Sequence, residues 1–252
     1  MKGLSANQLK LLAIIAMTAD HIAFVFLIPT VPLYYILRTF GRLTAPLMSY
    51  FIVEGFHHTR DRKKYLMRTS LFALISQSFY FIMVFGTPPV SLLEFATNWN
   101  VMYTFSLSII ILMIVDNQKL KWDKKAILII ICFAFSDLGD WSYIISAWVL
   151  LLFLFRNSKK KKTLAFIGVS TILVTYKFLP MFDSFVEFSY QYGTLLALIP
   201  LHFYNGKRSS QTEKKKSNSI SKYFFYIYYP LHMVLIILLK IVLLYLTNTF
   251  KL

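Results

Sequence analysis

Two residues near the start of the chain have side chains and a spacing that suit chemistry on a long ligand. Lys10 and His21 lie in one apolar stretch with ten residues between them. Eleven steps of about 100° make roughly three helical turns, so both side chains lie on one helix face, about 16 Å apart along the axis. Phosphates at one end of a ligand and a reactive group at the other would match this geometry. The same positions also suit a Lys10 that reaches lipid phosphate and a His21 that is a buried hydrogen-bonding group.

Asp20 stands beside His21 in the sequence but faces a different direction on a helix. Successive helical residues are about 100° apart, so Asp20 is poorly placed to contact His21. The next apolar stretch carries Arg38 and Arg42, and only a short turn separates the two stretches. An ionisable group in hydrocarbon costs at least ~2.5–3.5 kcal/mol, so such groups usually pair or line a cavity. We therefore expect Asp20 to pair with Arg38 or Arg42.

Further polar residues within or beside apolar stretches are candidates for a site. Glu54 and His58 are one helical turn apart and can pair with each other. His232 follows Pro230, which frees a backbone carbonyl in a way that membrane helices tolerate beside a cavity. The sequence contains no zinc-binding cluster, phosphate-binding glycine loop or Gly-x-Ser-x-Gly elbow, and its single cysteine, Cys132, lies in an apolar stretch. We therefore expect no metal site.

The composition is that of an integral membrane protein. The chain is 57% hydrophobic and 15% charged, with a mean hydropathy of +0.59, whereas a soluble domain carries about 25% charged residues. Its apolar stretches reach the roughly 17–25 residues that a bilayer core requires. We expect an all-α transmembrane bundle that forms a single domain over residues 1–252. About nine helices are predicted, at 8–27, 34–56 with a kink at Pro46, 65–85, 100–115, 126–136, 141–155, 164–179, 185–203 and 223–246.

Charged residues in the predicted loops alternate in sign along the chain. Lys and Arg concentrate in loops 60–64, 119–125 and 156–162 and in a basic cytoplasmic linker at 205–221. The intervening loops hold acidic residues and almost no Lys or Arg. The positive-inside rule then places the N-terminus in the cytoplasm and the C-terminus outside. The net charge of +16 thus reflects membrane topology and contact with anionic lipid, and we expect no nucleic-acid partner.

Several motifs, found in order over nearly the whole chain, resemble the TraX family. They lie at 20–22, 37–46, 54–66, 204–208 and 225–232. The name-giving member of that family N-acetylates a conjugative pilin subunit. The family is similar to the broader acyltransferase-3 type of membrane acyltransferases, which carry a basic residue, ten residues and then a His in the first helix. Lys10 and His21 stand in that pattern, whereas Glu54 stands where the broader group has a Ser.

The resemblance implies a membrane acetyltransferase of a bacterial-type cytoplasmic membrane. An acetyl or other acyl group would move from cytoplasmic acetyl-CoA to an amine or hydroxyl on a peptide, sugar or lipid. His21 would be the catalytic residue, as a general base or a transient acyl carrier. Asp20 and Arg42 would assist it. Basic residues at the cytoplasmic end would contact the CoA phosphates; these are Lys10, Arg60, Lys207 and Arg208. Polar residues would complete the cavity; these are Arg38, Glu54, His58 and His232.

Two other classes of function stay open from the residues alone. A non-enzymatic transporter or peptide-immunity protein could use buried Asp20, Arg42 and Glu54 as a polar pathway. A family member that has lost activity could keep the fold for an interaction role, although the intact spacing of Lys10 and His21 argues against this. Binding of acetyl-CoA to the purified protein would separate an acyltransferase from a transporter.

Overall fold

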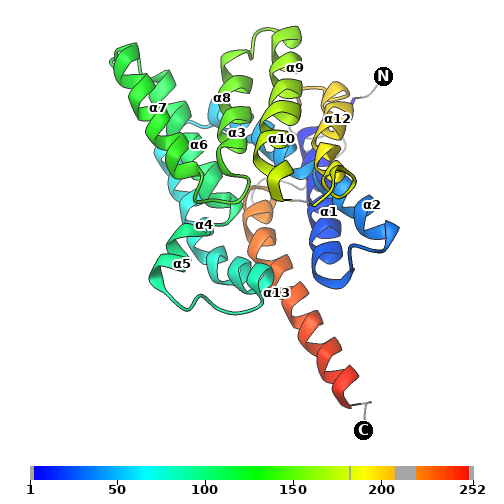
Figure 1. Cartoon of the computed structure of the whole chain (residues 1–252). Coiled ribbons are helices and arrows are strands. Elements are labelled where there is room, and N and C mark those ends of the chain that lie inside the picture. Colours follow the sequence, from blue (N-terminus) through cyan, green and yellow to red (C-terminus); the bar gives the residue numbers. More distant parts are fainter. Residues whose placement is uncertain (1–2, 182, 208–219, 250–252) are drawn as a thin grey trace.

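The computed structural model describes residues 3–181, 183–207 and 220–249. Within these residues the chain forms helices and no β-strand, apart from two single backbone bridges, so the predicted all-α class is confirmed (Figure 1). Helix α1 (Ala6–Phe26) lies beside α2 (Pro32–Gly41), α3 (Thr44–His58) and the last helix, α13 (Ile220–Thr249). Helix α4 (Arg62–Phe85) packs on α13 and on α6 (Val101–Asp116), and α6 in turn contacts α7 (Trp122–Ser136) and α8 (Ser142–Leu154).

Four helical segments in the described part of the chain have the length and apolar character needed to cross a membrane. They are α1, α4, α13 and a rod at Lys159–Met181. The rod joins α9 (Lys159–Gly168), a π-helical turn (Val169–Leu173), α10 (Val174–Phe178) and a 3-10 turn (Leu179–Met181). Helices α6 and α8 are apolar but shorter. The chain is therefore a membrane protein, but the prediction of about nine spanning helices is not confirmed.

The predicted helix at 34–56 is two helices. The break between α2 and α3 falls at Arg42 and Leu43, not at Pro46. Pro46 lies in the first turn of α3, where backbone N–H groups have no helical partner and a proline costs little. The hydroxyl of Thr44 donates to the carbonyl of Ala13 at 3.1 Å, which ties the start of α3 to α1. The kink predicted at Pro46 was therefore wrong, and the chain turns immediately after Arg42.

Two other segments differ from the predicted helices. The predicted helix at 185–203 is divided into α11 (Phe185–Phe188), a 3-10 stretch (Ser189–Ala197) and α12 (Leu198–His202). The 3-10 stretch lies against α2, where a Cβ on Gly193 would come 2.1 Å from the carbonyl oxygen of Thr39. The predicted loop after α4 contains a short helix, α5 (Leu92–Thr97), whose first turn is capped by Ser91. Contact with α2 thus accompanies the irregular 3-10 stretch, whereas a local cap starts α5.

The motif at 204–207 anchors the start of α1. The amide of Leu4 donates to the carbonyl of Phe203 at 2.8 Å, and the amide of Asn205 donates back to Leu4 at 3.0 Å. The side-chain amide of Asn205 donates to Gly3 at 2.7 Å. Gly206 has a φ of +72°, a region that glycine adopts without strain. This pairing fixes the end of α1 from which Lys10 projects. Residues 208–219 of the predicted linker lie outside the described residues.

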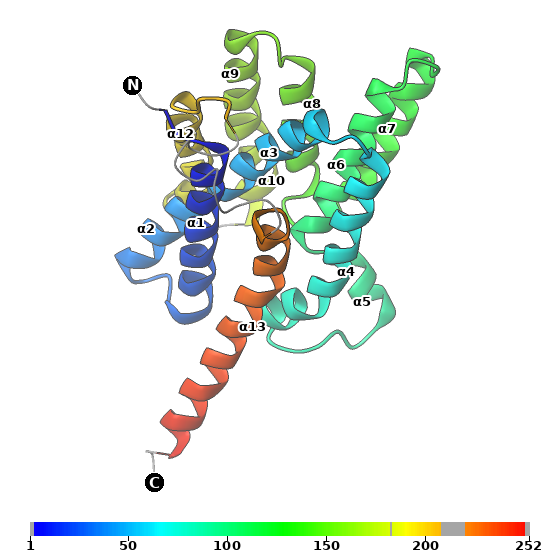
Figure 2. The same cartoon turned by 180° about the vertical axis from the view of Figure 1, so that it is seen from behind.

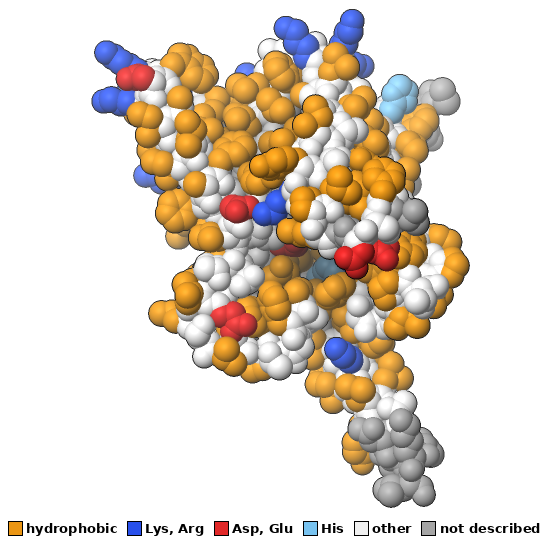
Figure 3. Space-filling view, in the orientation of Figure 1, with side chains coloured by type: hydrophobic (Ala, Val, Ile, Leu, Met, Phe, Trp, Pro, Cys, Tyr) orange, Lys and Arg blue, Asp and Glu red, His pale blue; other side chains and the backbone are white. Residues whose placement is uncertain are grey.

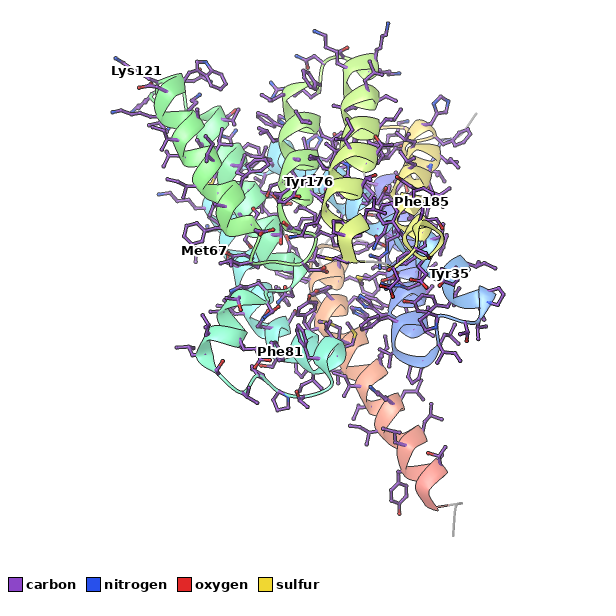
Figure 4. All side chains as sticks on the ribbon, viewed as in Figure 1. Tyr35, Met67, Phe81, Lys121, Tyr176 and Phe185 are labelled. Atoms are coloured by element: carbon purple, nitrogen blue, oxygen red, sulfur yellow. The ribbon has the colours of Figure 1, made fainter. Side chains whose placement is uncertain are left out.

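Basic side chains gather at one end of the molecule. Figure 3 shows Lys and Arg at the beginnings of α7 and α9, and Figure 4 places Lys121 at this end, with Phe81 in the opposite half. Acidic residues follow the other ends of these helices. Asp137 comes directly after α7, and Asp183 and Glu187 come after the rod that begins with α9. Figure 2 shows α13 between α1 and α4, continuing past the rest of the bundle to the C-terminal end. The molecule thus has a basic end and a less basic one.

Candidate functional site

Asp20 is held between two arginines in the interior of the bundle. Its Oδ2 accepts from Arg38 Nη1 at 2.8 Å and from Arg42 Nη2 at 2.6 Å. All three residues are at least nine-tenths buried. The predicted pairing of Asp20 with α2 is confirmed, and both arginines take part.

Aromatic rings complete the surroundings of the two guanidiniums. The Arg38 guanidinium lies 5.2 Å from the ring centre of Tyr190, and Arg42 lies 5.5 Å from the same ring. Arg42 also lies 5.2 Å from the ring centre of Trp141. The negative faces of aromatic rings attract cations, most strongly where water is excluded. Tyr190 belongs to the 3-10 stretch after α11, so this stretch helps to hold α2 against α1.

His21 forms a hydrogen-bonded pair with His232. Its Nδ1 lies 2.8 Å from His232 Nε2, and the two ring planes are within 10° of each other. The other nitrogen of His232, Nδ1, lies 3.0 Å from the carbonyl oxygen of Tyr228. Nearby, the hydroxyls of Thr18 and Tyr228 are 2.7 Å apart, which gives α1 and α13 a second polar contact.

The hydrogen bonds of the pair determine which nitrogen of His21 is free. A carbonyl oxygen only accepts, so His232 Nδ1 carries the proton, and in a neutral ring its Nε2 then carries a lone pair. His21 Nδ1 must therefore donate to His232 Nε2. This leaves the Nε2 of neutral His21 as an unprotonated nitrogen, which is the form that a base or nucleophile requires.

Two neighbouring cavities lie along the face of α1 that carries Lys10 and His21. The His21 cavity encloses about 740 Å³ of space outside the protein atoms, part of it open to the surroundings, and the Lys10 cavity encloses about 520 Å³. Both are lined by four apolar residues in common, Met48, Met102, Phe105 and Phe225. The His21 cavity also contacts Ala13, Ile14, Met17, Asp20, Gly41, Arg42, Thr44, Ala45, Val101, Asp140, Trp141 and Tyr229, and the Lys10 cavity also contacts Phe51, Ile52, Tyr65, Thr69 and Tyr226.

The structure therefore brings Lys10 and His21 to two adjoining cavities. The ammonium of Lys10 lies 5.2 Å from the ring centre of Phe51 and 5.3 Å from that of Phe225. Ile14 and Met17 lie between Lys10 and His21 on the same helix face, and both line the His21 cavity. A ligand that follows this face would run through mostly apolar surroundings from an ammonium to an imidazole.

Other predicted site residues lie away from these cavities. Arg60 and Lys207 are exposed and line neither cavity, and Arg208 lies outside the described residues. Glu54 and His58 are paired at 3.5 Å near the end of α3, where they also line neither cavity. Arg38 contacts Asp20 and His232 contacts His21, but neither residue is part of the lining of either cavity.

Asp140 is a cavity residue that its place in an acidic turn did not predict. It lines the His21 cavity, and its Oδ1 accepts from the amide of Trp141 at 2.9 Å. Its own amide donates to the carbonyl of Trp99 at 2.7 Å. The next two residues, Trp141 and Ser142, have φ values of 59° and 50°, a left-handed conformation that is costly for residues other than glycine. In the sequence, Asp140 is marked only by its position beside Trp141, just before a predicted helix.

Comparison with known proteins identifies the family. The family model described as "TraX protein" matches residues 5–240. The chain belongs to the TraX family. A curated relative of this TraX-family chain, the "Probable fimbrial assembly protein FimC, serogroup H1" of Dichelobacter nodosus, is 34% identical over 238 residues, which cover 92% of this chain and 94% of the relative. No solved structure matches the chain. The predicted family is confirmed, and both cavities lie within the matched residues.

Gly41 makes the contact between α1 and α2 possible at Asp20. A Cβ on Gly41 would lie 2.2 Å from Asp20 Cβ and 2.6 Å from its Oδ1. Gly41→Ala must therefore displace the carboxylate from its arginines, and we expect a loss of stability on the order of 3 kcal/mol because buried charges become unpaired. The midpoint of thermal unfolding in detergent measures this loss.

Gly168→Ala is the matched control, because a Cβ at this helical position meets nothing within 4 Å. This control should unfold at the temperature of the unmodified protein or slightly higher, since alanine favours helix over glycine. Equal unfolding midpoints for the two variants would contradict a close-packing role for Gly41.

Proposed function

We propose that this protein is an integral membrane acyltransferase that moves an acetyl group from acetyl-CoA to an amine or hydroxyl acceptor on a peptide or cell-envelope molecule. The observation that carries the proposal is the His21–His232 pair, which leaves Nε2 of His21 unprotonated in a residue that lines a cavity adjoining the Lys10 cavity. The similarity of the Lys10 and His21 spacing to acyltransferase-3 type enzymes supports the same conclusion.

An acyl-CoA would lie along α1 and occupy both cavities. The spacing of Lys10 and His21 along α1 is about 16 Å, a length that an extended pantetheine arm could span. The apolar residues common to both cavities, which include Met48 and Met102, would surround the arm. The thioester would then lie in the His21 cavity, and the phosphates would lie toward the basic end. Unbranched methionine side chains can repack around such a flexible ligand.

The proposed reaction uses the Nε2 of His21. As a general base, it would take the proton of the acceptor amine or hydroxyl while the acceptor attacks the thioester carbonyl. The carbon–sulfur bond would then break, and the proton would pass to the CoA thiolate. Alternatively, Nε2 would attack the carbonyl itself, and an acyl-imidazole would pass the group to the acceptor. Both routes begin at the same nitrogen and release the same two products.

Arg42 and Asp140 have suitable places for supporting roles. Arg42 lines the His21 cavity, and its buried Nε has no hydrogen-bond partner within the described residues. A guanidinium there would stabilise the negative charge that develops on the thioester oxygen. Asp140 lines the same cavity, where its carboxylate would accept a hydrogen bond from the acceptor and orient it.

The alternative of a transport pathway has weaker support. Such a pathway would connect Asp20, Arg42 and Glu54. Asp20 is fixed between two arginines, and Glu54 lies near the end of α3 beside His58, away from both cavities. The arrangement thus favours a cavity that accepts a ligand over a continuous polar path.

We also propose the nine-crossing topology in a bacterial-type cytoplasmic membrane, with the N-terminus cytoplasmic and the C-terminus outside. The gathering of Lys and Arg at one end of the molecule supports this orientation (Figure 3). In a Cys132→Ser background, Glu94→Cys should react with a membrane-impermeant maleimide added outside intact cells, whereas Lys160→Cys should react only after lysis. The reverse pattern would refute the orientation.

The purified protein in lipid nanodiscs tests the transferase proposal. With acetyl-CoA and an extract of envelope peptides, sugars and lipids, the protein should release CoA and add one acetyl mass to an acceptor, as followed by thiol assay and mass spectrometry. His21→Asn should lower the rate at least about 100-fold because the base is lost. His202→Asn is a control, since His202 is exposed and lines neither cavity. Transfer at an undiminished rate by His21→Asn would refute the mechanism.

His232 gives a second test, because it determines the tautomer of His21. His232→Leu cannot accept from His21 Nδ1, so the ring of His21 can turn or change tautomer, and kcat should fall on the order of 100-fold with little change in the KM for acetyl-CoA. His232→Gln keeps an acceptor and a donor and should retain more activity. Steady-state kinetics of the two variants measure the difference. A kcat in both variants equal to that of the unmodified protein would mean that His232 only fills space.

A further inference from the structure

Arg68 is a membrane-helix arginine without an acidic partner. It lies within α4, which is apolar enough to span a membrane. Arg38 and Arg42 pair with Asp20, and Arg62 pairs with Asp116, but Arg68 makes no ion pair with any described residue. Its buried Nε also has no hydrogen-bond partner within the described part of the chain. Because a membrane-helix arginine without an acidic partner is costly, the presence of Arg68 points to an anionic ligand.

The surroundings of Arg68 connect it to the Lys10 cavity. Its guanidinium donates a hydrogen bond to the hydroxyl of Tyr226 and lies close enough to the hydroxyl of Tyr65 to interact with it electrostatically. Both tyrosines line the Lys10 cavity, as does Thr69, the residue after Arg68. Arg68 is therefore next to the wall of a cavity that already contains an ammonium group.

Helix α13 connects the two cations. It packs against both α1 and α4 and lies between them (Figure 2). Phe225 of α13 contacts the Lys10 ammonium, and the next residue, Tyr226, lies beside Arg68. Lys10 and Arg68 thus approach the same short segment of α13 from two different helices. Both stand in the first half of helices that start near the basic end of the molecule.

We infer that Arg68, with Lys10 and the Tyr226 hydroxyl, forms a binding site for a phosphate ester or diphosphate at the Lys10 cavity. A guanidinium binds phosphate oxygens through paired N–H donors, and a partly desolvated one binds them more strongly than a surface residue can. The inner pair of Lys10 and Arg68 is therefore a better phosphate site than the exposed Arg60 and Lys207. The phosphate belongs to CoA if the proposed acyl transfer is correct, and to a phospholipid headgroup otherwise.

Ligand binding to the full-length protein in nanodiscs tests the site. Calorimetry with CoA and with pantetheine, which lacks the phosphates, separates the phosphate contribution from that of the arm. Arg68→Gln should raise the Kd for CoA on the order of 10-fold or more and leave pantetheine binding unchanged. Arg68→Lys keeps the charge but not the planar fork, so its Kd should be intermediate. The control is Arg156→Gln, because Arg156 lies over Phe153 and lines neither cavity.

The outcomes separate this inference from the proposed function. CoA binding that is unchanged in Arg68→Gln, with normal unfolding midpoints, would overturn the Arg68 site and leave the transferase proposal intact. If the unmodified protein binds no CoA but retains a phospholipid that Arg68→Gln loses, as seen by native mass spectrometry, the phosphate site is supported and the transferase proposal fails. If the unmodified protein binds neither CoA nor a phospholipid, both the Arg68 site and the transferase proposal are overturned. If Arg68→Gln does not fold, the Kd of Arg68→Lys for CoA is compared with that of the unmodified protein, and an unchanged Kd would overturn the Arg68 site.

Discussion

The contact of one carboxylate with two guanidiniums underlies the arrangement of the first three helices. Charges in an apolar interior are costly unless they are paired with good geometry, and Asp20 receives hydrogen bonds from both Arg38 and Arg42. Because these arginines stand at the end of α2, the contact fixes the position at which the chain turns into α3. The absence of a side chain on Gly41 lets the two backbones approach closely enough for the contact to form.

This contact also explains how two adjacent residues of α1 serve different purposes. Helical geometry directs Asp20 toward α2 and leaves His21 free to meet α13 and the cavity. Thr18 adds a hydroxyl contact to α13 on the same side as His21. At the other end of α1, the pairing of Leu4 with residues 203–205 fixes the level of Lys10. Helix α1 is thus held at both ends, and its cavity face carries the chemistry that the proposed function requires.

The parts of the site that could be predicted from the sequence are those that local geometry determines. The helical period gave the common face of Lys10 and His21, and the short turn after α1 gave the pairing of Asp20 with α2. The Glu54–His58 pair also follows from one helical turn. By contrast, the contact of His21 with His232 joins residues 211 positions apart, and it depends on how α13 packs against α1. No periodicity within either helix specifies it.

The missed features share a different physical cause. Asp140 reaches the His21 cavity because its loop pairs with the carbonyl of Trp99 and then passes through two left-handed residues, which the amino acids Trp141 and Ser142 do not favour locally. The break after Arg42 likewise has no proline or glycine at the turn itself that would mark it. Arg68 lies four residues after the basic stretch 60–64, so its place in the sequence does not distinguish it from the loop charges. In each case the deciding contacts come from elements distant in the sequence.

The hydrogen-bond partner of His21 is a neutral imidazole, that of His232, and not a carboxylate. A carboxylate beside the imidazole would stabilise its protonated form and hold the proton after the acceptor had given it up. The nearest carboxylate, that of Asp20, is already committed to two arginines, and the positions of these arginines near His21 oppose a further positive charge there. His232 orients the ring through a neutral hydrogen bond instead. In the low dielectric of a membrane interior, an imidazolium at this place would be poorly stabilised, which makes His21 a weaker base in the first step but lets the proton pass readily to the departing thiolate. The double arginine pair that organises α1 and α2 would thus also favour completion of the transfer step.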